Sequence, residues 1–131
     1  SMRIPPTLDK EIAVKSMKKA LTENPPYDAS ISVDFDEPAT GWNAPELDAW
    51  LDNAIQEASH AYFNKPALSM GEGGTIPFMA MLGEKFPEAQ FVITGVLGPE
   101  SNAHGPNEFL HIPFAKKLSA SIGFILNQYP S

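Results

Sequence analysis

The sequence contains no cysteine, which excludes disulfides and thiolate metal sites. It also contains no apolar run of the roughly 18 residues that a membrane span needs. Basic residues are few, since 9 Lys and Arg stand against 16 Asp and Glu and give a formal net charge of −7. Nucleic acids and anionic membranes are bound by clustered basic residues, so neither is an expected partner. The absence of cysteine fits a reducing compartment, and the predicted localisation is cytoplasmic.

Proline, in contrast, is abundant: the chain has 13, about twice the usual share of roughly 5%. These prolines divide the 131 residues, the length of one domain, into short segments. The start "SMRIPP" carries no basic-then-apolar signal region. Ser1 before Met2 is typical of a tag remnant, so we expect the chain to be a piece of a longer protein.

Apolar residues recur at helical spacing in four segments and predict helices over residues 5–24, 45–63, 76–86 and 113–129. Thr7 is expected to cap the first helix, and Pro45 to stand in the first turn of the second. In the last helix the residues expected to face inward are Phe114, Leu118, Ile122, Ile125 and Leu126.

Three further segments predict strands. Residues 31–36 alternate between apolar and polar side chains, as a strand with one wet face does. Residues 67–70 predict a short buried strand. Residues 90–96 are rich in β-formers without alternation, which is typical of a strand covered on both faces.

This order of elements predicts an α/β fold. From residue 45 to residue 131, helices and strands alternate as in a three-layer domain with helices on both faces of a mixed sheet. Residues 1–36 predict a separate β-α-β unit, and the Pro-, Gly- and Asn-containing residues 37–44 predict the junction. Ligands bind beyond the carboxyl ends of such strands, so the irregular loops that follow two of them are expected to share one rim.

The loop "LGPESNAHGPNEFL", residues 97–110, carries the sharpest candidate for chemistry, His104. A neutral imidazole binds zinc well, and Pro99, Gly105 and Pro106 would fix its direction. One histidine is not a metal site, however. A loop histidine that only bonds the backbone therefore remains the alternative from the residues alone.

The stretch "GEGGTIP", residues 71–77, places backbone N–H groups and the Thr75 hydroxyl at a predicted helix start. Such an end binds carboxylate or phosphate, although the glycines also suit a tight turn and the lysine of a phosphate loop is missing. The sole arginine, Arg3, is either a surface charge or a clamp for a carboxylate. His60 and His111 are expected to be structural or exposed.

Four segments together resemble the carboxyl-terminal part of a zinc metallopeptidase family: "MRIPPT" followed by a helix, "GW" before a helix, "GEGGTIPF" and "GVLGPESNAHGPNEFL". The family includes carnosinase-like dipeptidases, aminoacylases, glutamate carboxypeptidases and succinyl-diaminopimelate desuccinylase. The resemblance covers essentially the whole chain and is closest to the dipeptidase branch. It implies hydrolysis of the amide bond of dipeptides or N-acyl amino acids that carry a free carboxylate.

The resemblance assigns a metal role to the irregular loop. It implies that His104, in "HGPNE", is the last metal ligand and that Asn107 and Glu108 brace the loop behind it. It also implies that the whole enzyme holds two zinc ions, or manganese or cobalt in their place.

The resemblance assigns the glycine-rich turn and the arginine to substrate binding. It implies that Gly74 and Thr75, in a turn shaped by Glu72 and Gly73, receive the substrate carboxylate together with Arg3. By the same resemblance, residues 1–36 are half of a lid or dimerisation domain, and residues 45–131 are the carboxyl-terminal part of the catalytic domain.

The other metal ligands of the family, in an "HxD" motif, a bridging acid and a "Glu-Glu" pair, are missing from this chain. The first glutamate of that pair is the family's general base, so no catalytic residue is expected here and the chain alone is expected to bind no zinc and to be inactive. "EPATGW" also lacks the histidine that polarises the scissile carbonyl in some relatives.

The expected partners are a peptide substrate, the amino-terminal part of the enzyme and, through strand edges of the lid, a second copy in a homodimer. The alternative is a stand-alone binding or dimerisation module without catalysis.

Overall fold

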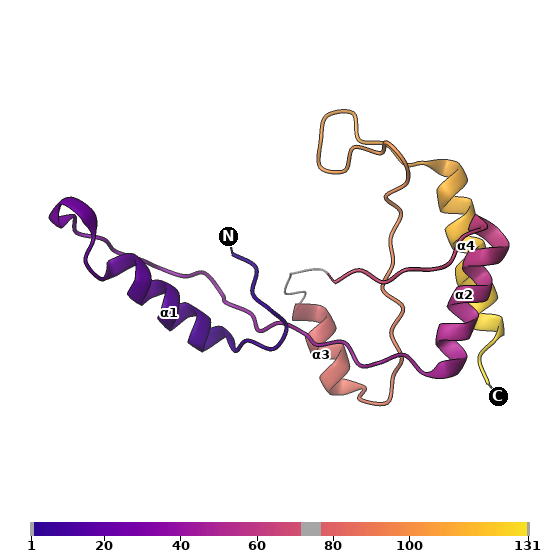
Figure 1. The fold of residues 1–131 in the computed structure, drawn as a ribbon, viewed down its shortest axis with the longest axis horizontal. Helices are drawn as coiled ribbons and strands as arrows, with labels where there is room; N and C mark the ends of the chain where they lie inside the picture. The colour runs from indigo at the N-terminus through magenta and orange to yellow at the C-terminus, as the bar shows by residue number, and fades with distance from the viewer. Residues whose placement is uncertain (1, 72–76, 131) are drawn as a thin grey trace. The chain divides into compact units, whose positions relative to one another are not determined.

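The computed structural model describes residues 2–71 and 77–130, in which the regular elements are helices. In chain order they are α1 (Lys10–Thr22), the 3₁₀ turn η1 (Pro26–Asp28), α2 (Ala49–Phe63), α3 (Pro77–Lys85) and α4 (Ile112–Asn127) (Figure 1). The chain divides into two compact units, Ser1–Ala44 with Gly71–Ala89 and Pro45–Met70 with Gln90–Ser131. None of the described helices is both long and apolar enough to cross a membrane.

The predicted α/β fold is wrong, because no residue in 2–71 or 77–130 lies in a β-strand. The alternation of residues 31–36 persists only in part as a burial pattern, with Val33 and Phe35 half-buried and Asp34 exposed, because Ile31 is exposed as well. A strand, however, also needs a ladder of backbone hydrogen bonds to a neighbouring strand, which alternation does not supply. The strand edges from which a homodimer was predicted are therefore absent from the described part of the chain.

The other two predicted strands are also wrong, and their backbone partners and exposure differ from those of a strand. In residues 67–70, the backbone N–H and C=O of Ala67 bond to the side-chain amide of Gln56 at 3.0 and 3.2 Å. In residues 90–96, Ile93 is 57% exposed, whereas a strand covered on both faces would bury it. Both segments are irregular chain within the second unit.

The first helix, α1, is capped by Asp9 rather than by Thr7. The Asp9 carboxylate accepts hydrogen bonds from the backbone N–H groups of Glu11 at 2.8 Å and Ile12 at 3.1 Å. A capping carboxylate satisfies N–H groups that the helix leaves unpaired and lies favourably at the positive end of its dipole. The Thr7 prediction is wrong because the chain is still in a turn at that residue.

We expect Asp9→Ala to destabilise α1 by about 1 kcal/mol, because two N–H groups lose their acceptor. Amide hydrogen exchange across Lys10–Thr22, measured by NMR, should then be about fivefold faster. Asp9→Asn keeps an acceptor at the cap and is the matched control. If Thr7→Ala accelerated exchange as much as Asp9→Ala, the cap assignment would be wrong.

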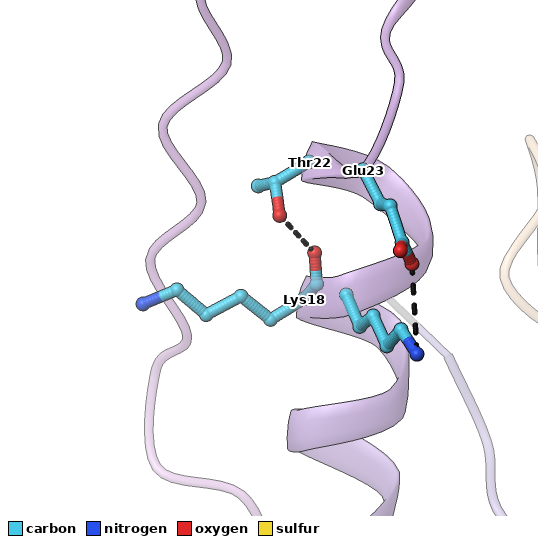
Figure 2. Close-up of polar contacts among 4 residues, drawn as sticks. Lys18, Thr22 and Glu23 are labelled. Carbon is cyan, nitrogen blue, oxygen red and sulfur yellow. Dashed lines mark hydrogen bonds and ion pairs between the residues drawn. The ribbon is translucent and has the colours of Figure 1, made fainter.

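The carboxyl end of α1 is held by local contacts (Figure 2). The Thr22 hydroxyl donates to the Lys18 carbonyl at 2.8 Å, and the Lys19 ammonium lies 3.6 Å from the Glu23 carboxylate. The side chains of this ion pair are 72% and 56% exposed, so the pair contributes little to stability. The chain leaves the helix at Glu23, which is extended (φ −84°, ψ 122°), and Asn24 follows with a φ of 52°.

The first unit also contains α3, which forms where the sequence predicts a helix. Trp42 lies against this helix at Gly83, where an added Cβ would stand 2.7 Å from the indole Nε1. The close approach of ring and helix backbone therefore depends on the absence of a side chain at this position.

The core of the second unit forms where α2 and α4 pack side by side (Figure 1). Leu51, Ala54 and Ala58 recur at three- and four-residue spacing along α2, and Ile125 meets them from α4. All four are at most 7% exposed, and the two alanines allow the helices to approach closely. The apolar stripe predicted for this helix is confirmed at these three α2 positions.

Aromatic pairs mark both ends of this helix pair. Trp50, near the start of α2, meets Tyr129, just beyond α4, edge to face with ring centroids 5.3 Å apart. Phe63, at the end of α2, lies 5.2 Å from Phe114, near the start of α4. The start of one helix therefore lies beside the end of the other, so α2 and α4 are antiparallel.

Two predicted details of these helices are wrong. α2 begins at Ala49 rather than Pro45, because Asp48 is extended (φ −61°, ψ 146°) and its N–H donates to Gln90 Oε1 at 2.8 Å. Leu126 was expected to face inward from α4 but is 71% exposed, since the α2 contact uses Ile125 instead.

Candidate functional site

The loop that precedes α4 contains the site candidate, and its base is fixed by backbone geometry. Gly98 has a φ of 62°, a left-handed conformation that favours glycine. A Cβ at Gly98 would overlap the Cβ of His111 and stand 3.0 Å from Ser101 Oγ. Ser101 is 4% exposed, donates from its hydroxyl to the Gly98 carbonyl at 3.1 Å and accepts the Phe109 N–H at 3.2 Å on its own carbonyl. These contacts close the loop where it leaves the chain and where it returns.

The loop leads directly into α4 (Figure 1), and His111 is the residue that precedes the helix. The Nδ1 atom of His111 accepts the backbone N–H of Phe114 at 3.1 Å and so caps the helix. A side-chain acceptor at this place satisfies an N–H group that the helix cannot pair. His111 therefore has a structural role, and it anchors one end of the loop to a helix of the core.

The tip of the loop is a turn that carries His104. The Gly105 N–H donates to the Asn102 carbonyl at 2.9 Å, which makes His104 the third residue of the turn. His104 has a φ of 61°, the positive sign that type II turns have at their third residue. Its backbone N–H donates to Glu108 Oε2 at 3.1 Å. Asn107 has a φ of 58°, and its side chain makes no hydrogen bond among the described residues.

The imidazole of His104 is exposed, and within residues 2–71 and 77–130 neither ring nitrogen has a hydrogen-bond partner. The contacts of this residue run through its backbone instead. The loop thus fixes where His104 sits and leaves both ring nitrogens available to a ligand from outside.

The other predicted site residues are not assembled around this loop by any described contact. Arg3 belongs to the first unit, is exposed and is not among the residues that line the open groove of about 720 Å³ between α1 and residues 34–39. The predicted carboxylate pocket lies outside the described residues; its members are Glu72, Gly73, Gly74 and Thr75. His60 is exposed in the last turn of α2.

Sequence reasoning missed three residues that shape the loop: Gly98, Ser101 and Asn102. The side chain of Asn102 donates from Nδ2 to the Pro106 carbonyl at 2.7 Å. The signal that was available is composition, because Asn and Gly are the residues most tolerant of left-handed backbone, and the loop contains both.

The loop supplies one donor that suits zinc, the imidazole of His104. A free imidazole nitrogen is a typical zinc donor, but structural and catalytic sites use three or four protein ligands. Among residues 2–71 and 77–130 no group of three or more His, Cys, Asp or Glu side chains is placed to hold a metal. A metal held by His104 would need its other ligands from outside these residues.

No protein-family model matches this chain. It is similar to a curated protein, the cysteinylglycine-S-conjugate dipeptidase of Corynebacterium striatum, with 27% identity over 126 residues. The match covers 88% of this chain and 27% of that protein, so the chain spans about a quarter of the length of its relative. The similarity loosely supports a relationship to the peptidases.

Proposed function

We propose that this chain is the carboxyl-terminal part of a metal-dependent hydrolase that cleaves the amide bond of dipeptides or N-acyl amino acids with a free carboxylate. The observation that carries the proposal is His104, an exposed histidine held through its backbone on a closed loop, with both ring nitrogens free among the described residues. The similarity to a dipeptidase over 88% of the chain supports it independently.

In this proposal each part of the chain has a separate task. His104 contributes one metal ligand, and the Glu108 carboxylate holds its backbone in place. Arg3, together with Gly74 and Thr75, binds the substrate carboxylate. The zinc ion, when bound, supplies Lewis-acid chemistry at the scissile amide. The general base and the remaining ligands belong to a part of the enzyme that precedes this sequence.

The gene tests the proposal directly. We expect the reading frame to continue upstream of Arg3 and to encode an "HxD" motif and an adjacent Glu-Glu pair. A frame that opens at Met2 would contradict the proposal and support a stand-alone binding module instead.

The activity of the longer protein is the second test. We expect metal-dependent hydrolysis of dipeptides, with S-conjugates of cysteinylglycine as the first substrates to try because they are named for the bacterial relative. Turnover should be lost on treatment with a chelator and restored by zinc, manganese or cobalt, and this chain alone should show none. Turnover by the chain alone would contradict the assignment of the base and the other ligands to the missing part.

A further inference from the structure

The His104 turn adopts an unfavourable backbone conformation. A φ of 61° at the third position of such a turn is normally taken by Gly or Asn, and for other residues it costs free energy. Glu100, Asn102 and Asn107 in the same loop also have positive φ. Such conformations persist only where the surrounding contacts over-determine them, so particular contacts must hold this turn.

Two side chains make the contacts that hold the turn. Glu108 accepts the His104 N–H, as described above. Asn102 reaches across the whole turn, because its backbone carbonyl accepts the Gly105 N–H and its side-chain amide donates to the Pro106 carbonyl. The two residues that follow His104 are thus tied back to Asn102, which lies two residues before it.

Gly105 leaves room for the side chain of Asn102. A Cβ at Gly105 would stand 2.6 Å from both Nδ2 and Oδ1 of Asn102. Gly105 is not in the left-handed region, so its own backbone would accept a side chain. The reason for glycine here is therefore the Asn102 amide that lies over it.

We propose that Asn102 is a positioning residue for the His104 imidazole. Its bonds to Gly105 and Pro106 fix the backbone from which the imidazole projects, and so set the direction in which the side chain of His104 leaves the chain towards a metal. This inference rests on the proposed function only in naming the metal, because the contacts of Asn102 with Gly105 and Pro106 are a property of the chain itself. The groups that orient a metal ligand are known to govern affinity, with losses of about 10- to 100-fold when they are removed.

Asn102→Asp is the sharpest variant, because aspartate keeps the shape and tolerates left-handed backbone but cannot donate to the Pro106 carbonyl. Asn24→Asp is the matched control, since it makes the same chemical change at an exposed positive-φ residue that lies outside this loop and has no side-chain hydrogen bond among the described residues. Gly105→Ala displaces the Asn102 amide sterically and should copy the effect of Asn102→Asp. In an Asn102→Ala background, Gly105→Ala should add nothing.

The first experiment is NMR on this chain. We expect Asn102→Asp to change the three-bond HN–Hα coupling and the intraresidue NOE of His104, which report its φ, and to accelerate exchange of the Gly105 amide roughly fivefold or more. Asn24→Asp should leave both unchanged. An unchanged His104 φ in Asn102→Asp overturns the inference, whatever the enzyme does.

The second experiment is zinc competition against a chromophoric chelator with the longer protein. We expect Asn102→Asp to lower zinc affinity about 10- to 100-fold, with Asn24→Asp unchanged. If His104→Ala lowers zinc affinity and Asn102→Asp lowers only the melting temperature, Asn102 is merely structural and the inference fails alone. If His104→Ala leaves zinc affinity unchanged, the proposed function fails, and the NMR result still decides whether Asn102 orients His104.

Discussion

His104→Ala is expected to lower kcat/KM of the longer enzyme by more than about 100-fold. Loss of a residue that only orients a ligand costs about 10- to 100-fold, and loss of the ligand itself should cost more. Steady-state hydrolysis of a dipeptide at saturating zinc, together with the zinc content of the purified variant, measures both parts of the effect.

The chain offers a matched control in His60, which is exposed in the last turn of α2 and lies outside the loop. His60→Ala should retain activity and zinc. Far-UV circular dichroism should show that both variants keep their helices. Equal zinc content in His104→Ala and the unaltered enzyme would remove His104 from the list of ligands.

Leu51→Ala is expected to lower the free energy of unfolding of the α2–α4 unit by about 2–5 kcal/mol. Leu51 is 2% exposed and is the largest fully buried side chain of the described residues, so its truncation removes apolar contacts and leaves a cavity. Urea unfolding followed by circular dichroism at 222 nm, a standard helix signal, measures the change in midpoint.

Two variants make this result specific. Leu126→Ala removes the same atoms from a side chain that is 71% exposed, and it should cost no more than about 0.5 kcal/mol. Leu51→Met conserves volume and should cost less than about 1.5 kcal/mol, which keeps the comparison possible if Leu51→Ala does not fold. Similar losses from Leu51→Ala and Leu126→Ala would mean that the α2–α4 contact contributes little to stability.

The helices could be predicted from the sequence because their signals are local. Each of the four shows apolar residues at helical spacing, and each forms in the expected region. The first residues of α1 and α2 were harder to predict, because a side-chain cap decides one and a backbone hydrogen bond to a distant residue accompanies the other. The Asp9 side chain caps α1, and the N–H of Asp48 bonds Gln90, a residue 42 positions later in the chain.

The strands could not be predicted reliably because pairing is not local. Val33 and Phe35 do turn to a less exposed side than Asp34, which is all that alternation describes. Ala67 shows the competing outcome, since its backbone is satisfied by the Gln56 amide. Neither outcome can be read from the residues of the segment itself.

Some features of the candidate site could likewise be predicted from the sequence, and others could not. The position of His104 between two Gly-Pro corners was visible in the sequence, and these residues were expected to fix its direction. The left-handed φ of His104 and the bond from Asn102 to Pro106 were not visible, because they depend on how the loop closes on itself. The carboxylate pocket predicted at Gly74 and Thr75 lies outside the described residues and stays a prediction.

The two tryptophans of the chain lie one in each unit, Trp42 against α3 and Trp50 against Tyr129. Each indole is therefore an intrinsic fluorescent reporter of its own unit. Trp50→Phe leaves emission from the first unit, and Trp42→Phe leaves emission from the second. Denaturation of the two single-tryptophan proteins would give one shared transition if the units unfold cooperatively and two separate midpoints if each unit melts by itself.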